Sequence, residues 1–600
     1  MLKSVDGVSG DENISNHFKT VYADLYNSVP SNTELQDLLR DINMSIDDKD
    51  LDNVDEVDPS IIEECISKLR CGKSDSKYDF GSDAYIHASD ILSLQLSFLF
   101  KTFLIHSFVP IFLLVCSLVP IIKDKLGDSA SSDNYRAIAI SSLFLKIFDW
   151  IILILHGDKL STSDLQFGFQ TGSSTVMCSW IVSEVISYYT RHKTSVYCCL
   201  LDLKKAFDKV KFSVLFSKLH EKGMPCVFIR LLIFMYCNQA CKVRWNKSFS
   251  ESFSIVNGVR QGAVLSPSLF SLYIDKLLIY LKSSGLGCNV GNHFYGASAY
   301  ADDIILLSPT RGGLQDMFNI CFDYFNEHDI TISTNPDPQK SKTKCIYFPY
   351  GKQEHTPTPI LMGDKELPWV DTWPHLGNNI DRNDFVYPGK GCLYQDLMDK
   401  RGSFIGKFHS LHQEFGFTNP DIMMKIVQIY ATSFYGSPLW SYSSKEAEKL
   451  FTSWNILVRQ VYGVPNTTHR YLIESMSKSK HLKTVIYKRY LSFLHSVVNS
   501  KKDCLSSLGK KMIVDSGSIT MKNLKLISKE TGQENIMGIA PCEVINGYQY
   551  SPIPLGEEWR VGLLDELIDL KNGSLNLEWD DNSELSPDDL NDLINFVATS

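Results

Sequence analysis

Apolar positions in the first 310 residues change between helical and extended spacing. Residues 17–26 and 35–42 repeat their apolar side chains every three or four positions, which predicts two amphipathic helices near the N-terminus. Residues 196–203 and 299–307 are short, nearly continuous apolar runs, and such runs are typical of buried strands. The chain therefore combines helices with strands that have little contact with solvent.

Helical spacing recurs in three further parts of the chain. It covers residues 208–235 and 267–281, and it dominates from about residue 394 to 498. A polar, proline-rich stretch at 349–358 predicts a loop. Because strands and helices interleave without a steady βα alternation, the pattern predicts an α+β fold and not a doubly wound sheet.

Changes in composition divide the chain into four parts. Residues 1–60 form an acidic N-terminal extension, 61–393 a body that is densely apolar to about residue 348, 394–502 a mainly helical part, and 503–600 a C-terminal extension. This extension ends in an acidic tail with a short helix predicted at 587–596. Six hundred residues exceed what one core needs, which agrees with two to four domains.

The net charge of −10 is distributed unevenly along the chain. Residues 1–60 carry 14 acidic and 4 basic side chains, and residues 556–600 carry 12 acidic and 2 basic ones. The region between them, 61–555, holds 53 basic against 43 acidic side chains. Acidic ends around a basic body are compatible with a centre that binds a polyanion, although ordinary solvated charge is the alternative interpretation.

Cysteine usage and hydropathy indicate an intracellular protein without membrane spans. None of the 15 cysteines forms a CxxC pair, so we expect free, buried thiols in a reducing compartment. The apolar stretches at 98–122 and 138–155 are interrupted by charged residues, and the first also by prolines. They predict buried core elements. The N-terminus has no secretory signal pattern.

The strongest local signal for chemistry is Tyr300-Ala301-Asp302-Asp303, which lies between two apolar runs. This arrangement predicts a tight hairpin turn that presents two carboxylates at a sheet edge. Phosphoryl transfer enzymes use such carboxylates to hold two divalent ions roughly 3.5–4 Å apart. A solvated turn is the commoner origin of an Asp-Asp pair, so the motif needs a third carboxylate.

Asp202 provides that third carboxylate, because it ends the apolar run before it and Ala-Phe follows four residues later. Phe207 would lie under the sugar of an incoming nucleotide, where its ring excludes a 2′-hydroxyl. The alternatives are that Phe207 is a plain core residue and that Asp208 caps the next helix.

A glycine-containing stretch at 257–267 lies between these two motifs. Gly258 and Gly262 would let the backbone approach a nucleotide closely, and the amide of Gln261 would contact that nucleotide. Ser266-Pro267 has the cap and first-turn proline of a helix start. Alone, the stretch could be an ordinary loop-to-helix junction.

In this order, the three motifs resemble the reverse transcriptases of non-LTR (LINE-type) retrotransposons, which carry LDxxKAFD, GVRQGxxLSPxLF and YADD. The resemblance covers about residues 60–500. It implies a right-hand polymerase, with fingers and an antiparallel palm sheet over 61–393 and a helical thumb over 394–502. Such an enzyme extends a DNA primer on an RNA template from deoxynucleoside triphosphates. Asp202, Asp302 and Asp303 would hold two Mg²⁺ ions, with Mn²⁺ as an alternative.

The resemblance also implies roles for basic residues outside the three motifs. Lys123 and Arg136 would meet the triphosphate, Arg136 through charge-assisted hydrogen bonds. Lys342, preferred to Lys340 and Lys344, would assist the departure of pyrophosphate, and a solvated basic loop is the alternative. Residues 373–377 resemble the hairpin that grips the primer.

Other interpretations remain open from the sequence. A group II intron-type maturase and a retron-like enzyme share the palm, whereas a viral RNA polymerase would carry a smaller residue at Phe207. The alternative from another class is a catalytically idle RNA-binding protein derived from a transposon.

The sequence contains no recognisable nuclease, so we expect the endonuclease to be supplied elsewhere. Target-primed synthesis would place the protein in the nucleus, and otherwise we expect it in the cytoplasm. The sequence does not indicate an oligomeric state.

Overall fold

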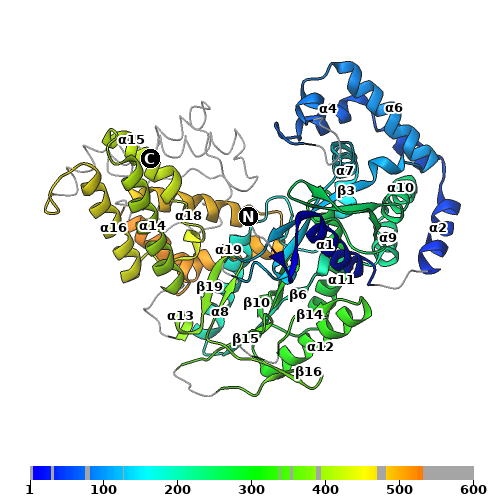
Figure 1. The fold of residues 1–600 in the computed structure, drawn as a ribbon. Coiled ribbons are helices and arrows are strands. Elements are labelled where there is room, and N and C mark those ends of the chain that lie inside the picture. The colour runs from blue at the N-terminus through cyan, green and yellow to red at the C-terminus, as the bar shows by residue number, and fades with distance from the viewer. Residues whose placement is uncertain are drawn as a thin grey trace. The chain divides into compact units, whose positions relative to one another are not determined.

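A computed structural model describes residues 4–530 apart from eight short gaps at 29–32, 75–80, 126, 336, 338–339, 352–355, 387–393 and 469–480. The acidic tail and the short helix predicted at 587–596 lie outside the described residues. The chain folds into two compact units (Figure 1). The first unit comprises Met1–Phe169, Leu203–Tyr280 and Ile320–Ser333, and the second Gln170–Asp202, Leu281–Asn319 and Thr334–Ser600.

The first unit is built on a sheet with strand order β4-β3-β7-β8, in which β9 also pairs with β7. β3 is antiparallel to β4 and parallel to β7. The strands of the first unit, inside and outside this sheet, are β1 (Ser4–Val5), β2 (Val8–Ser9), β3 (Val115–Ile122), β4 (Tyr135–Ile140), β6 (Leu203–Lys204), β7 (Ala240–Trp245), β8 (Ser248–Phe249), β9 (Phe253–Ser254) and β14 (Thr331–Ile332). Its helices are α1 (Asp11–Tyr26), α2 (Thr33–Ser45), α3 (Asp48–Asp55), α4 (Pro59–Ser67), α5 (Asp83–Ile86), α6 (Asp90–His106), α7 (Leu143–His156), α9 (Phe212–Glu221) and α10 (Cys226–Cys237), with short 3₁₀ turns η1 (Ile111–Leu113), η2 (Ser132–Asn134), η3 (Gly157–Leu160) and η4 (Ala206–Lys209).

Helix α1 packs on this sheet through one apolar stripe. Ile14, Phe18, Tyr22 and Tyr26 are buried and recur every four residues, which places them on one helix face. They join a core with side chains of β3, β4 and β7. Phe18 stacks on Trp245 of β7, with ring centroids 5.4 Å apart. The N-terminal extension is therefore part of the folded body of the first unit.

The second unit contains an antiparallel sheet with strand order β12-β13-β5-β15. The strands of the second unit, inside and outside this sheet, are β5 (Val196–Leu201), β10 (Asn289–Val290), β11 (His293–Phe294), β12 (Ala297–Tyr300), β13 (Asp303–Ser308), β15 (Lys344–Phe348), β16 (Ile360–Met362), β17 (Lys365–Leu367), β18 (Thr372–His375) and β19 (Asn378–Asp381). Its helices are α8 (Thr175–Arg191), α13 (Arg382–Val386), α14 (Tyr394–Phe415), α15 (Pro420–Ala431), η5 (Ser437–Leu439), α16 (Lys445–Val461), α18 (Leu482–Val498), α19 (Asp503–Val514) and α20 (Ile519–Glu530). Two further helices, α11 (Ser266–Ser283) and α12 (Arg311–Glu327), run through a boundary between the units.

Most of the predicted elements are present. Strands occupy both apolar runs. Between residues 394 and 498 the described secondary structure consists of helices, with no strand among the described residues. The stretch 208–235, expected to be helical throughout, is instead broken into η4, α9 and α10. Gly223 has a left-handed φ of 73° and Pro225 follows it, so the helix must stop between α9 and α10.

The prediction that both long apolar stretches are buried holds for residues 138–155 but only in part for 98–122. Phe100, Phe103 and Leu104 are buried, whereas Phe98, Phe108, Ile111 and Phe112 are 50–64% exposed. Residues 98–122 include the end of α6 and all of β3, and residues 138–155 include the end of β4 and most of α7. Among the described residues, no helix combines the length and apolarity needed to cross a membrane. Every described cysteine is free, and all of them except Cys71 and Cys237 are buried.

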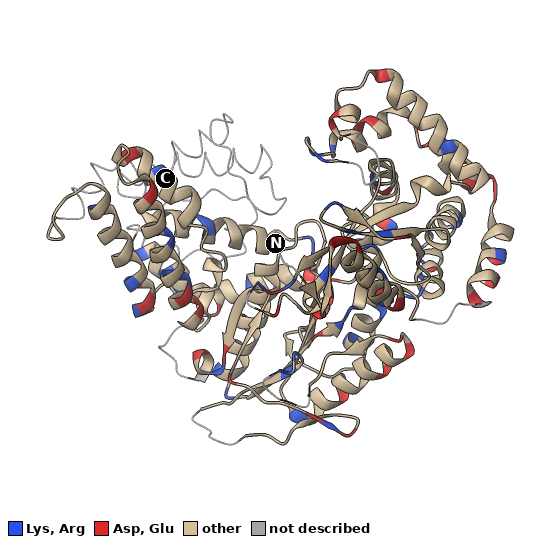
Figure 2. Cartoon of the chain, in the orientation of Figure 1, with Lys and Arg blue, Asp and Glu red and all other residues tan. Residues whose placement is uncertain are grey.

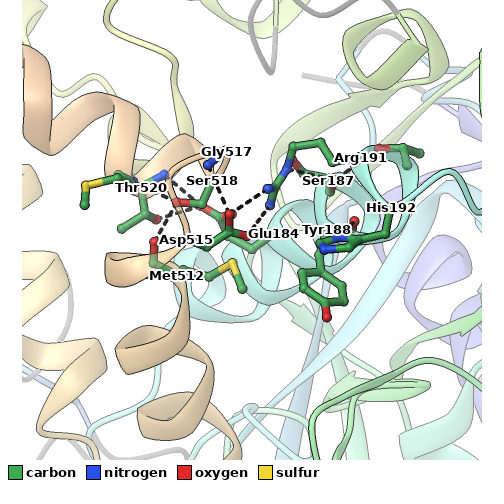
Figure 3. A network of polar contacts seen from close by, with 12 residues as sticks. Glu184, Ser187, Tyr188, Arg191, His192, Met512, Asp515, Gly517, Ser518 and Thr520 are labelled. Atoms are coloured by element: carbon green, nitrogen blue, oxygen red, sulfur yellow. Dashed lines mark hydrogen bonds and ion pairs between the residues drawn. The ribbon is translucent and has the colours of Figure 1, made fainter.

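The C-terminal helices of the second unit are tied to α8 by buried polar contacts (Figure 3). Glu184 accepts hydrogen bonds from the backbone N–H and the hydroxyl of Thr520, at 3.0 and 2.6 Å. Arg191, at the end of α8, pairs with Asp515 at 2.9 Å. Burial raises the pKa of the Glu184 carboxyl, while the bonds from Thr520 oppose that rise. The residues from 503 to 530 are therefore packed as part of this unit.

Charged residues of both signs are interspersed along the described helices and do not form one block (Figure 2). Several pair locally, for example Lys101 with Asp55 in the first unit and Lys483 with Glu530 in the second. Exposed pairs of this kind contribute little to stability. The described surface thus mixes both signs of charge.

Candidate active site

The Asp302-Asp303 pair lies at the turn of the β12–β13 hairpin. Tyr300 pairs with Asp303 as the last rung, so Ala301 and Asp302 form the two-residue turn. Ala301 is buried and has a φ of 56°, a left-handed value that is uncommon for alanine. Two-residue hairpin turns require such a φ, and local strain of this kind concentrates at functional sites. The predicted hairpin is therefore present, with a strained residue at its tip.

Strand β5 brings Asp202 to the same edge of the sheet. Leu201, the last residue of β5, pairs with Ile304 of β13, so the next residue on β5 lies beside the preceding residue on β13. These two residues are Asp202 and Asp303. Asp202 is partly buried, and its backbone N–H donates to the hydroxyl of Thr343 at 3.1 Å. The register thus places the backbone of the third predicted carboxylate next to the Asp-Asp turn.

Lys342 precedes β15 on the other side of β5. Lys344 pairs with Leu200, and continuing this register by two residues sets Lys342 opposite Asp202. Lys342 is exposed, whereas Lys344 is buried with its ammonium 3.8 Å from the ring centroid of Trp373. Burial lowers the pKa of Lys344. For the predicted role at a leaving pyrophosphate, which stays a prediction, Lys342 is more accessible than Lys344.

Metal ligation by this edge of the sheet stays a prediction. In the part of the chain that the structure describes, no three His, Cys, Asp or Glu side chains are grouped to hold an ion on their own. Asp302 is partly buried and Asp303 is exposed. Mg²⁺ commonly takes one or two carboxylates and completes its shell with water and substrate phosphates. The carboxylates of Asp202, Asp302 and Asp303 are the right donors for such an ion.

Gln261 lies in the first unit and is held by a buried carboxylate. Its Nε2 donates to both carboxylate oxygens of Asp208, at 3.0 and 3.2 Å. Asp208 also accepts a hydrogen bond from the hydroxyl of Tyr26 at 2.9 Å. Burial raises the pKa of Asp208 to about 6, and the bond from Tyr26 and the charge of Lys205 oppose that rise. The suggestion that Asp208 caps the following helix is wrong, because α9 begins after Lys211 and has no side-chain cap.

The two glycines of the Gln261 loop approach protein backbone. A Cβ at Gly258 would lie 2.6 Å from the carbonyl oxygen of Asp208, and one at Gly262 would lie 3.0 Å from the carbonyl oxygen of Ala139. Their φ angles of 91° and 102° also favour glycine. The sequence predicted that these glycines let the backbone approach a nucleotide. The structure shows that glycine at both positions lets this loop pack against neighbouring backbone.

Replacing Gly258 by alanine should therefore destabilise the first unit more than the φ angle alone explains. We expect Gly258→Ala to lower the free energy of unfolding by roughly 3–6 kcal/mol, since backbone strain and overpacking add. Gly223→Ala is the matched control, because Gly223 has a φ of 73° but open space at its Cβ. It should cost only about 1–3 kcal/mol. Equal losses for the two variants in urea unfolding would contradict the predicted clash.

Phe207 lies on η4, and its ring stacks on Phe270 of α11, with centroids 4.2 Å apart and an interplanar angle of 19°. Phe270 is fully buried, whereas Phe207 is half-buried. One face of the Phe207 ring is therefore supported by the core. A ring held in this way is more rigid than a mobile side chain, which suits the predicted steric gate.

The predicted triphosphate ligands lie at one end of the β3–β4 pair. Arg136 pairs with Ile121 and is exposed, and Lys123 directly follows β3 and is also exposed. The ammonium of Lys123 donates to the carbonyl oxygen of Asp133 at 2.8 Å. The positive charge of Lys123 acts on the buried Asp208 carboxylate, which it stabilises. Both cations therefore belong to the same unit as Gln261.

Sequence reasoning missed two residues of this arrangement. Asp208 was visible as the last residue of the Asp202 motif but was considered only as a cap. Nothing in the pattern of residues 1–60 distinguishes Tyr26 from other apolar residues on its helix.

Comparison with known proteins agrees with this geometry. The sequence profile of the family described as "Reverse transcriptase (RNA-dependent DNA polymerase)" matches residues 122–373. That range contains the Asp202 motif, the Gln261 loop and the Asp302-Asp303 turn in the expected order. This chain contains a reverse transcriptase domain.

Its relatives are proteins of non-LTR retrotransposons. This chain is 28% identical over 256 residues to the Pol polyprotein of the type-2 retrotransposable element R2DM of Drosophila melanogaster, covering 41% of this chain and 23% of the relative. It is 27% identical over 250 residues to the R2 Pol polyprotein of Nasonia vitripennis, covering 40% and 24%. The matched region thus spans about a quarter of the length of these relatives.

Solved telomerase structures overlap with the chain only loosely. Apo telomerase of Candida tropicalis shows a TM-score of 0.31 at 13% identity, covering 52% of this chain and 61% of that one. The fold expectation is nevertheless confirmed: a reverse transcriptase domain of the α+β, right-hand polymerase class is followed by a mainly helical segment. Reverse transcriptase domains use divalent metal ions and copy an RNA template with deoxynucleoside triphosphates.

Proposed function

We propose that this chain is an RNA-directed DNA polymerase of the non-LTR retrotransposon type. It extends a DNA primer on an RNA template by two-metal nucleotidyl transfer. One observation supports this most directly: the register of β5 and β13 sets Asp202 beside the Asp302-Asp303 turn, inside the reverse transcriptase domain.

In this proposal, Asp202, Asp302 and Asp303 hold two Mg²⁺ ions, which would activate the primer 3′-hydroxyl and stabilise the leaving pyrophosphate. Lys342 meets the pyrophosphate from the opposite side of β5. These residues lie together in the second unit. We assign the chemical step to these residues because they gather at one edge of the β12-β13-β5-β15 sheet.

Residues of the first unit recognise the incoming nucleotide. Lys123 and Arg136 bind the triphosphate, and Phe207 excludes a ribose 2′-hydroxyl. Gln261 and Gly262 form the loop that faces the nucleotide. Exposure of both cations and the half-exposed ring of Phe207 support these roles.

The proposal extends to partners and organisation. The substrates are an RNA template, a DNA primer and deoxynucleoside triphosphates, with the endonuclease supplied elsewhere. Residues 61–393 form fingers and palm, 394–502 the thumb, and 1–60 and 503–600 are extensions. Synthesis primed at nicked target DNA would place the protein in the nucleus.

Primer extension tests the proposal directly. The purified chain should extend oligo(dT) on poly(rA) with dTTP and Mg²⁺, and EDTA should abolish the reaction. Mn²⁺ in place of Mg²⁺ would show whether the choice of ion matters. RNA binding without extension under either ion would overturn the proposal and identify an idle RNA-binding protein. Preference for UTP over dTTP would instead indicate an RNA polymerase.

A further inference from the structure

The last residue of helix α1 lies against the loop that carries Gln261. Tyr26 is 2% exposed, and its backbone carbonyl oxygen accepts hydrogen bonds from the N–H groups of Val256 and Asn257, both at 3.2 Å. The side chain of Asn257 then donates to the carbonyl oxygen of Asp208 at 2.7 Å. The end of α1, the Gln261 loop and the turn after Phe207 are therefore joined by buried hydrogen bonds.

The side chains continue this connection. The Tyr26 hydroxyl donates to Oδ1 of Asp208 at 2.9 Å, and Nε2 of Gln261 donates to the same carboxylate. An ionised carboxylate only accepts hydrogen bonds. Asp208 therefore selects one orientation of the Gln261 amide, in which Nε2 faces the protein and Oε1 faces away from the carboxylate.

We propose that Tyr26 and Asp208 are positioning residues for the incoming deoxynucleotide, acting by fixing the orientation of the Gln261 amide. The inference rests on the proposed polymerase function and adds part of the N-terminal extension to the nucleotide site. Tyr26 supplies the donor that holds Asp208, and Asp208 supplies the acceptor that holds Gln261. A helix 182 residues away in sequence from Asp208 thereby controls a side chain of the site.

Electrostatics support the arrangement. Burial raises the pKa of Asp208, and the hydrogen bond from Tyr26 is the largest influence that lowers it again. Without this bond, the carboxyl would be protonated over more of the physiological range. A protonated carboxyl can donate as well as accept, so it would no longer select one orientation of the amide.

Helix α1 also provides a matched control. Tyr22 lies one turn earlier, is 3% exposed and packs in the same core. Its hydroxyl is buried, and among the described residues it has no hydrogen-bond partner. Tyr22→Phe and Tyr26→Phe therefore delete the same atom from the same helix, but only the second deletes a hydrogen bond to Asp208.

Steady-state kinetics of dTTP incorporation test the inference. Tyr26→Phe should raise the KM for dTTP roughly tenfold with kcat little changed, because a hydrogen bond to a charged group contributes on that order. Asp208→Asn, which places an amide donor where only acceptors stood, should raise it further. Tyr22→Phe should match the wild type. All three variants should melt cooperatively.

A double-mutant cycle separates positioning from a purely structural role. Gln261→Ala should raise the KM for dTTP, and adding Tyr26→Phe to it should change the KM no further, since the residue through which Tyr26 acts is gone. Additive effects, or a wild-type KM in Tyr26→Phe and Asp208→Asn, would overturn the inference while leaving the polymerase function intact. A wild-type chain that extends no primer would overturn the proposed function and this inference with it.

Discussion

Primer extension by the Asp302→Asn variant is expected to fall by roughly 10³-fold or more, while RNA binding stays nearly unchanged. The substitution keeps the shape of the side chain and removes the negative charge that holds a divalent ion. Ion ligation is worth several kcal/mol to phosphoryl transfer, and each 1.4 kcal/mol is about tenfold in rate. Single-turnover extension measures the chemical step, and filter binding of labelled RNA measures the complex.

The control for Asp302→Asn is the same change at Asp316, which is exposed on α12. It removes one negative charge from the second unit without touching the sheet edge, and we expect activity within about twofold of the wild type, as for most surface substitutions. Comparable losses in both variants would show that the effect is general. Near-normal extension by Asp302→Asn would remove Asp302 from the metal site.

The Phe207→Val variant is expected to incorporate ribonucleotides more readily relative to deoxynucleotides. The half-buried ring is supported from behind by Phe270, so it cannot move away from a 2′-hydroxyl without disturbing the core. Shrinking the ring opens space for that oxygen and leaves metal ligation unchanged. Pocket contacts of this size discriminate by roughly 10–200-fold. Single-nucleotide incorporation of UTP against dTTP measures the ratio.

A plain core role for Phe207 predicts a different result. In that case Phe207→Val would lose stability and reduce the use of both nucleotides together, as expected for Phe216→Val on α9, where the ring is fully buried. Phe216→Val is therefore the matched control. If folded Phe207→Val keeps the wild-type ratio, the ring does not select the sugar.

Much of the fold and of the candidate site could be predicted from local sequence patterns. Two aspartates between apolar runs predicted the β12–β13 hairpin, because an ionised pair cannot sit inside a buried strand. The Ser266-Pro267 signal predicted the start of α11, since a proline is tolerated at the first turn. The predicted serine cap is wrong, because Ser266 is itself the first residue of α11 and its hydroxyl accepts no capping hydrogen bond. These features depend on residues a few positions apart, which a sequence displays directly.

Contacts between distant segments were beyond such reasoning. The hydroxyl of Tyr26 finds Asp208 only because α1 packs across the sheet of β3, β4 and β7, and that packing depends on many side chains at once. The glycines show the same limit. Their left-handed φ could be anticipated, but the backbone that lies against each of them could not.

The bonds between α8 and Thr520 decide where this chain can be shortened. A protein ending at residue 502 would lose the partner of Arg191 and both donors to Glu184, which would leave the buried Glu184 carboxylate without the hydrogen bonds of Thr520. α8 also packs on β5 and β12, the strands that lead to Asp202 and to the Asp302-Asp303 turn. The smallest recombinant piece that preserves the predicted metal-binding edge therefore reaches residue 530.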